Sequence, residues 1–124
     1  MSEIKGHRDL IVWQKAMDLV AEAYGLAKLL PKTEEYRLTS QLLRAATSIP
    51  ANIAEGHARG TRKDYAHFIS IAYGSLAETE TLVLLTVKVG LLKSDDVKSA
   101  LGQCQEIGRM LNALRTRLRA PAET

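Results

Sequence analysis

The sequence is poor in the residues that interrupt helices or cross-link a chain. It has three prolines and eight glycines in 124 residues, and aromatic side chains make up only 5% of it. Its single cysteine, Cys104, excludes an internal disulfide and a cysteine-based zinc site, which suits a reducing compartment. Length and composition therefore predict one domain over residues 1–124, with a hydrophobic core of its own.

Long apolar runs are also missing from the sequence. The stretch Met1–Arg8 lacks the apolar segment of a signal peptide, and no apolar run approaches the roughly 20 residues that cross a bilayer. We therefore expect a cytoplasmic protein without a membrane partner. Neither sign of charge dominates, because 17 Lys and Arg against 14 Asp and Glu give a net charge of +3. Such a mild excess permits nucleic-acid binding without requiring it.

Helical periodicity is what the sequence does contain, and no segment has the pattern of a strand. Apolar residues recur three and four positions apart, which predicts helices over about residues 10–30, 38–56, 62–89 and 95–118. Helices of this length with short connections predict an all-α fold, an antiparallel up-down-up-down four-helix bundle.

The helix ends have recognisable cap residues. Asp9, Thr61 and Ser94 are the expected N-caps of the first, third and fourth helices. Gly56 and Gly60 are expected to end the second helix and Gly90 the third.

The first helix has two apolar stripes. The stripe expected to face the core consists of Leu10, Trp13, Met17, Val20, Tyr24 and Ala27, and a second flank consists of Leu19, Leu26 and Leu30. The third helix likewise carries more apolar surface than three neighbouring helices can cover. Both excesses predict self-association, and the alternative is a large exposed apolar patch.

The second helix contains Pro50 and a polar stripe. The proline should kink the helix, with Thr47 and Ser48 bonding to freed carbonyls. The polar stripe is predicted to meet the third helix in a buried network that fixes the helix register; its residues are Gln41, Arg44, Ser48, Asn52, Glu55 and, on the third helix, Glu78. The alternative is that this stripe lines a subunit interface or a central channel.

Two basic clusters are the candidate nucleic-acid site. One flanks the turn into the third helix and the other lies toward the end of the last helix; together they comprise Arg59, Arg62, Lys63, Arg109, Arg115, Arg117 and Arg119. Such groups can neutralise phosphates. The alternative is that cations near a helix C-terminus only complement its dipole and keep the surface solvated.

No pattern points to catalysis, a metal or a cofactor. The glycines around His57 lack the spacing of a phosphate-binding loop and the strand that precedes one. Asp64 and His67 form one carboxylate–histidine pair, whereas a di-iron bundle needs two pairs and further inward carboxylates. We therefore expect no enzymatic activity.

Several segments together resemble the four-helix bundle protein family, whose members include proteins encoded by intervening sequences in large-subunit ribosomal RNA genes. The most specific segment is Ser48-Ile-Pro-Ala-Asn-Ile-Ala-Glu-Gly56, and the others are residues 9–16, 38–41, 44–46, 62–63 and 74–78. The family is similar to the accessory protein of diversity-generating retroelements, a basic bundle that binds a reverse transcriptase and RNA. Leu43 and Ala58 depart from the family pattern, which often has Arg and Gly there.

The resemblance implies a homopentameric ring with no assigned catalytic activity. The expected function is therefore a non-enzymatic, homo-oligomeric scaffold that binds RNA or a nucleic-acid-processing enzyme, such as a reverse transcriptase-like protein, through its basic surface. The alternative is a protein–protein adaptor whose basic surface binds an acidic partner without nucleic acid.

Overall fold

The computed structural model describes residues 4–121, so the first three residues of the N-terminal stretch discussed above lie outside it. It contains four long helices and, over the described residues, no strand. The helices are α1 (Ile11–Leu29), α2 (Ser40–Ala58), α3 (Arg62–Lys88) and α4 (Ser94–Arg119). Short 3-10 turns η1 (His7–Asp9) and η2 (Lys32–Glu34), and a π-helical turn η3 (Glu35–Thr39), precede α1 and α2. The all-α, four-helix prediction is confirmed, and each boundary falls within two residues of its predicted position.

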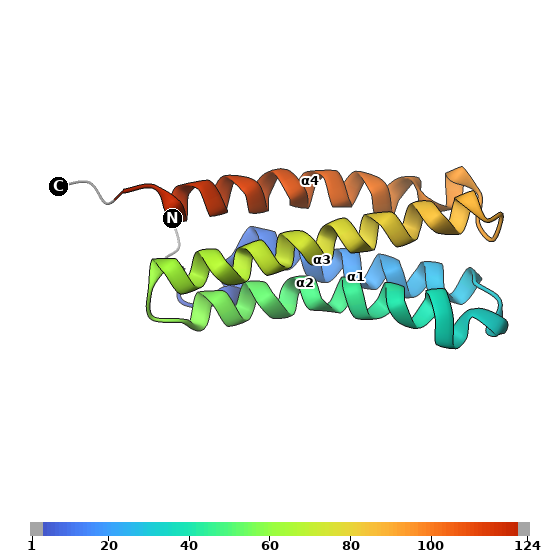
Figure 1. Cartoon of the computed structure of the whole chain (residues 1–124), viewed down its shortest axis with the longest axis horizontal. Coiled ribbons are helices and arrows are strands. Elements are labelled where there is room, and N and C mark those ends of the chain that lie inside the picture. Colours follow the sequence, from blue (N-terminus) through green and yellow to red (C-terminus); the bar gives the residue numbers. More distant parts are fainter. Residues whose placement is uncertain (1–3, 122–124) are drawn as a thin grey trace.

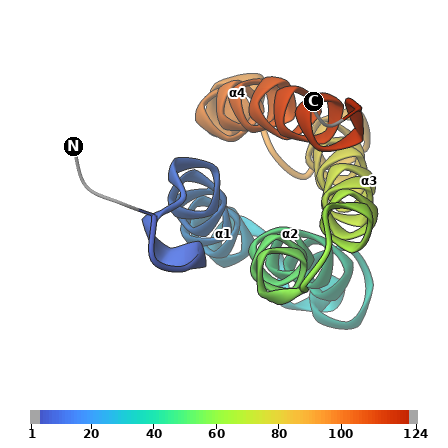
Figure 2. The same ribbon diagram turned by 90° about the vertical axis from the view of Figure 1, so that its left-hand side faces the viewer.

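The four helices lie side by side along the long axis of the molecule (Figure 1). The chain runs from left to right along α1 and α3 and from right to left along α2 and α4. Seen end-on, the helices follow an arc from α1 through α2 and α3 to α4 (Figure 2). The most extensive contact joins α2 to α3, and the contact that closes the arc between α1 and α4 is smaller.

The core is formed by one apolar face from each helix. In α1 the buried residues are Val12, Ala16, Leu19, Ala23 and Leu26, followed by Leu30. The predicted core stripe of α1 was therefore wrong, because Met17 is 45% exposed and Tyr24 50% exposed. Both stripes of α1 have helical spacing, and the smaller Ala16 and Ala23 allow α1 to approach its neighbours closely. The larger side chains, including half-buried Trp13, lie on the outer side.

Pro50 lies inside α2, which continues through it as far as Ala58. The hydroxyl of Thr47 donates to the carbonyls of Leu43 (2.9 Å) and Arg44 (3.1 Å). Neither is the carbonyl that Pro50 frees, which is that of Ala46, and the Ser48 hydroxyl contacts Ser75 on α3, so the predicted bonds to freed carbonyls were wrong. The irregular backbone lies upstream instead, at Arg37 (φ −120°, ψ −108°), where η3 leads into α2.

Two of the three predicted N-caps were wrong. Asp9 does not cap α1; its carboxylate accepts the Lys5 backbone N–H at 2.8 Å and so closes η1. Ser94 is the first residue of α4, and the Asp96 carboxylate accepts the Lys93 backbone N–H at 2.9 Å. The third cap is confirmed, since the Thr61 hydroxyl oxygen accepts the Asp64 N–H at 3.1 Å.

Gly56 does not end α2, contrary to prediction, but allows α2 to approach α3. It is buried two residues before the end of the helix. A Cβ atom at this position would lie 2.8 Å from the Cβ of Phe68 and 3.2 Å from the carbonyl oxygen of Tyr65. Gly90, by contrast, ends the turn after α3 with φ at +81°, a conformation that favours glycine.

By length and composition alone, α3 could cross a membrane. The sequence pattern did not predict this, because the apolar residues of α3 do not form an uninterrupted run. An 18-residue stretch of it has a mean hydropathy of 1.3, and 33% of that stretch is buried. A core helix passes the same test, so the finding is weak evidence for a membrane span. As predicted, α3 also has surplus apolar surface, because Ile71, Leu84, Leu85 and Val89 are exposed.

Two glycine substitutions test the close approach of α2 to α3. Gly56→Ala should destabilise the protein by about 1–3 kcal/mol, because the added methyl group overlaps Phe68 and the Tyr65 backbone. The matched control is Gly102→Ala in α4, where a Cβ meets no atom within 4 Å. It should stabilise the fold by about 0.5–1 kcal/mol through helix propensity. Urea unfolding measures both; equal effects would contradict the close approach.

Cys104 is buried, as its place on the apolar stripe of the last helix predicts. Burial first, and the neighbouring Glu80 second, raise the pKa of its thiol from 9.0 to about 12. The unfolded chain therefore loses this proton at lower pH than the folded chain, so stability should fall as pH rises from about 9 toward 12. The urea midpoint of Cys104→Ala should fall less steeply over this range. Parallel pH profiles of the two proteins would contradict the assignment.

Candidate nucleic-acid interface

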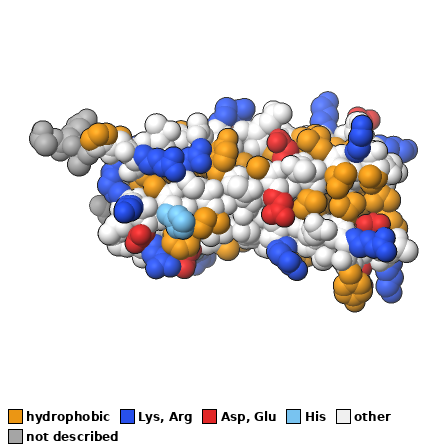
Figure 3. Space-filling view, viewed as in Figure 1, with side chains coloured by type: hydrophobic (Ala, Val, Ile, Leu, Met, Phe, Trp, Pro, Cys, Tyr) orange, Lys and Arg blue, Asp and Glu red, His pale blue; other side chains and the backbone are white. Residues whose placement is uncertain are grey.

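The two predicted basic clusters meet at one end of the bundle. The first lies where α2 turns into α3 and the second in the last turns of α4. Lys and Arg side chains gather at this end, on the left of the space-filling view (Figure 3). We call this surface the basic end and define it as Arg59, Arg62, Lys63, Arg115, Arg117 and Arg119. The two clusters are separated by about 50 positions in the sequence, and only the return of α4 along α3 brings them together.

Arg62 joins the two clusters directly. One of its terminal nitrogens donates to the backbone carbonyl of Arg117 at 2.6 Å. The same carbonyl also accepts the backbone N–H of Ala120 at 3.3 Å, so Arg62 adds a second donor at the C-terminus of α4. A second bond crosses in the other direction, from Arg119 to the hydroxyl of Ser70 at 3.0 Å. The basic end is therefore held together by specific contacts between α3 and α4.

Two further arginines lie over aromatic rings. The guanidinium of Arg59 is 4.8 Å from the centroid of the Phe68 ring and also pairs with Glu55 at 3.0 Å. Arg115 lies 4.5 Å from the centroid of Tyr73 and donates to Asn112 at 3.0 Å. These contacts orient the guanidinium groups while leaving several of their five N–H donors available.

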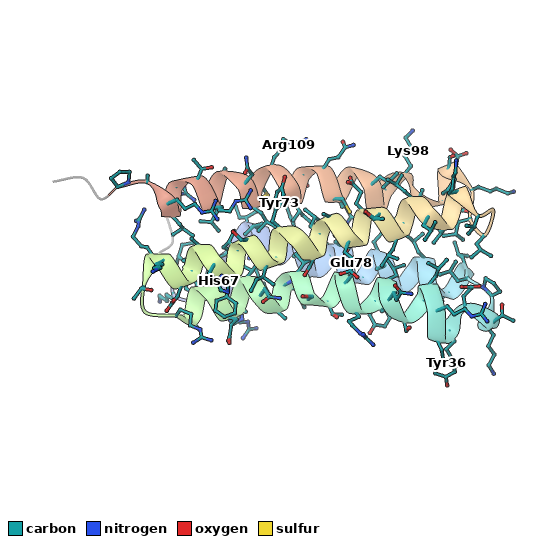
Figure 4. All side chains as sticks on the ribbon, viewed as in Figure 1. Tyr36, His67, Tyr73, Glu78, Lys98 and Arg109 are labelled. Carbon is teal, nitrogen blue, oxygen red and sulfur yellow. The ribbon has the colours of Figure 1, made fainter. Side chains whose placement is uncertain are left out.

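Arg109 does not join the basic end. It lies ten residues before Arg119, a distance of about 15 Å along a helix. It lines a separate cleft of about 330 Å³ between α3 and α4, with Tyr73 and Glu80. Figure 4 labels Arg109 on the outer side of α4, well away from His67.

Sequence reasoning had considered His67 only as a metal ligand and had not considered Ser70. Lys63, His67 and Ser70 are spaced by four and three, so a helical reading of the basic cluster would have placed them on one face. All three line the cleft where α3 meets the end of α4. No group of three or more His, Cys, Asp or Glu residues within 4–121 has the arrangement of a metal site.

Tyr65 lies half-buried beside these residues. Burial raises the pKa of its phenol, and the nearby charge of Arg117 partly opposes the change. The side chain is therefore a neutral hydroxyl at physiological pH.

The predicted polar stripe is only partly a buried network. The hydroxyls of Ser48 and Ser75 lie 2.9 Å apart across the contact between α2 and α3. Asn52 donates to the Ser48 carbonyl at 2.8 Å and to its hydroxyl at 2.9 Å, and the hydroxyl of buried Thr79 donates to the Ser75 carbonyl. Small hydroxyl groups therefore form the polar contact between these helices. Ser75 was not part of the predicted network.

The charged members of the predicted stripe lie at the surface. The exposed members are Gln41, Arg44, Glu55 and Glu78. Glu55 pairs with Arg59, four residues further along the chain. Among residues 4–121 no ion pair or side-chain hydrogen bond joins Arg44 to Glu78. Figure 4 shows Glu78 on the outer face of α3.

Two apolar grooves lie outside the basic end. The α1–α2 groove, about 340 Å³, is lined by Trp13, Met17, Val20, Pro50, Ala51 and Ala54. The α3–α4 groove, about 500 Å³, is lined mainly by Leu84, Leu85, Val87, Val97 and Leu101. The exposed apolar side chains near the C-terminus of α3 form a visible patch on the right of Figure 3. In the end-on view the α1–α2 and α3–α4 pairs lie on opposite sides of the bundle (Figure 2).

Comparison with known proteins agrees with the predicted resemblance. Residues 8–113 match the family described as 23S rRNA-intervening sequence protein. A crystal structure from Bacteroides thetaiotaomicron VPI-5482, described as a protein with unknown function from the S23 ribosomal protein family, has the same fold with a TM-score of 0.79. It is 26% identical in sequence, and the match covers 85% of this chain and 98% of that chain. No curated protein matches the chain. The chain belongs to the 23S rRNA-intervening sequence protein family.

Proposed function

We propose that this protein is a non-enzymatic scaffold that binds RNA, or a nucleic-acid-processing enzyme acting on RNA, through its basic end. The observation that carries the proposal is the convergence of Arg62 and Lys63 with Arg117 and Arg119, held by hydrogen bonds between α3 and α4. A dense group of fixed cations matches the phosphate backbone and releases its counterions on binding. The family name refers to 23S ribosomal RNA, which makes a structured RNA the first ligand to test.

A protein–protein adaptor for an acidic partner is the second candidate. The observation in its favour is that, over residues 4–121, the basic end has no open aromatic platform. Tyr65 and Phe68 are half-buried, and Arg115 covers Tyr73. Single-stranded RNA is commonly bound by stacking of its bases on such rings. Contacts to phosphate and sugar must therefore supply the affinity of an RNA complex.

Charge reversal at the basic end tests RNA binding. We expect the affinity for a labelled 23S rRNA segment, measured by fluorescence anisotropy, to fall steeply with salt. Arg115→Glu with Arg119→Glu should abolish binding, because both substitutions replace attraction to phosphate by repulsion. The matched control, Lys28→Glu with Lys32→Glu, makes the same change in charge at the opposite end and should retain binding. No affinity at low salt, or equal loss in both variants, would contradict the RNA-binding proposal.

We further propose that antiparallel up-down-up-down bundles associate into a closed ring, which the family resemblance puts at five subunits. The two apolar grooves support this arrangement, because they are different surfaces on opposite sides of one chain. A head-to-tail contact between unlike surfaces closes into a ring when the rotation between neighbours allows it. Exposed Met17 and Leu84 are the large apolar side chains that such a contact would cover.

Single lysine substitutions test the ring. Met17→Lys damages the α1–α2 groove and Leu84→Lys the α3–α4 groove, and light scattering should show that each variant alone is monomeric. An equimolar mixture should form a dimer, since each variant retains the groove that the other has lost. Tyr36→Lys is the control; this side chain is 88% exposed outside both grooves, and the variant should assemble like the unmodified protein. A monomeric unmodified protein would contradict the ring.

A further inference from the structure

A cleft opens inside the basic end, between the first turns of α3 and the last turn of α4. Its volume is about 560 Å³, and the residues that matter for its chemistry are Arg62, Lys63, His67, Ser70, Leu118 and Arg119. It is distinct from the two apolar grooves and from the cleft that holds Arg109. Figure 4 labels His67 near the start of α3.

The cationic side chains on both walls are held in place. Arg62 spans from α3 to the carbonyl of Arg117 on α4, and Arg119 spans from α4 to the hydroxyl of Ser70 on α3. Each contact uses one terminal nitrogen, so most of the five N–H donors of each guanidinium remain available to a ligand. Donors that are already oriented lose little conformational entropy when they bind.

The charge of the cleft is of one sign. Arg62, Lys63 and Arg119 contribute three cations, and no Asp or Glu is among the residues that line it. Charges of one sign confined to a small space repel one another, and a bound anion relieves that repulsion. Of the neighbouring acids, Glu55 is paired with Arg59, and Asp64 is not among the lining residues.

The size of the cleft and its apolar floor indicate which kind of chemical group is attached to the bound anion. Small-molecule sites commonly measure about 300–1,000 Å³, and this cleft has room for more than a bare phosphate. Leu118 and Ala66 give it an apolar floor, while His67 and Ser70 add neutral hydrogen-bonding groups. We infer that the cleft binds one phosphate group of an RNA strand, with the attached ribose packed on the apolar floor. The inference rests on the proposed RNA-binding function and names the part of the basic end that makes a specific contact.

Nucleotide titrations test the cleft apart from the rest of the basic end. Uridine 3′-monophosphate should shift the NMR signals of cleft residues, and inorganic phosphate should shift the same residues with lower affinity. Ser70→Met fills the cleft without changing the charge and should weaken uridine 3′-monophosphate binding by about tenfold or more. Lys63→Gln should weaken it similarly, and neither residue is in the hydrophobic core, so circular dichroism should show an unchanged fold. Arg109→Gln, with the same loss of charge on α4 but in a separate cleft, should leave nucleotide affinity within about twofold.

The outcomes separate the cleft from the general function. For RNA binding, Lys63→Gln should reduce the slope of log K against log salt concentration by about 1. Ser70→Met should weaken the affinity for RNA although the long-range electrostatic attraction to RNA is unchanged. If Ser70→Met binds RNA as tightly as the unmodified protein, the cleft inference is overturned and the RNA-binding proposal stands. If poly-glutamate competes as well as the nucleotide, the cleft selects charge alone and the inference is also overturned. If no RNA binds at low salt but the nucleotide shifts stay confined to the cleft, the proposed function fails and the phosphate site remains.

Discussion

The contact between α2 and α3 is the constraint on which the other features depend. The two helices approach so closely at Gly56 that a methyl group there would overlap Phe68. Further along, the hydroxyls of Ser48 and Ser75 meet at 2.9 Å. Small residues allow the helices to pack tightly, and the paired hydroxyls are satisfied only in one register. This contact sets the direction in which α3 leaves the turn, and hence where its first basic residues lie.

The basic end follows from that geometry. Once α3 is fixed against α2, α4 returns along α3 and its last turn reaches the first turns of α3. The bonds from Arg62 and Arg119 then cross between the helices, so the two cations connect α3 to α4 and also line a cleft. A structural and a binding role are therefore combined in the same side chains. Arg109, on the same helix but about 15 Å away, takes no part.

Helical periodicity predicted the number and extent of the helices well, because spacing by three and four is a local property of the chain. It was less successful for α1, where both apolar stripes satisfy the pattern. The stripe with Ala16 and Ala23 faces the core, whereas Met17 and Tyr24 remain exposed. The N-caps predicted at Asp9 and Ser94 were each wrong by one residue. The Asp9 carboxylate binds the Lys5 N–H, and it is Asp96 that accepts the Lys93 N–H at the start of α4. Composition alone could not show whether a charged pair such as Arg44 with Glu78, or the hydroxyl contact of Ser48 with Ser75, joins α2 to α3.

The sequence by itself determined the all-α class, the four helices, the family and the presence of two basic clusters, since each of these depends on residue type and spacing along the chain. Only the tertiary structure decided that the clusters meet, that Arg109 stands apart, and that His67 and Ser70 share a cleft with Arg119. It also decided which stripe of α1 is buried. The physical reason is that these outcomes depend on how closely helices pack. That distance is set by small residues such as Gly56, which packs against Tyr65 and Phe68, nine and twelve positions further along the chain.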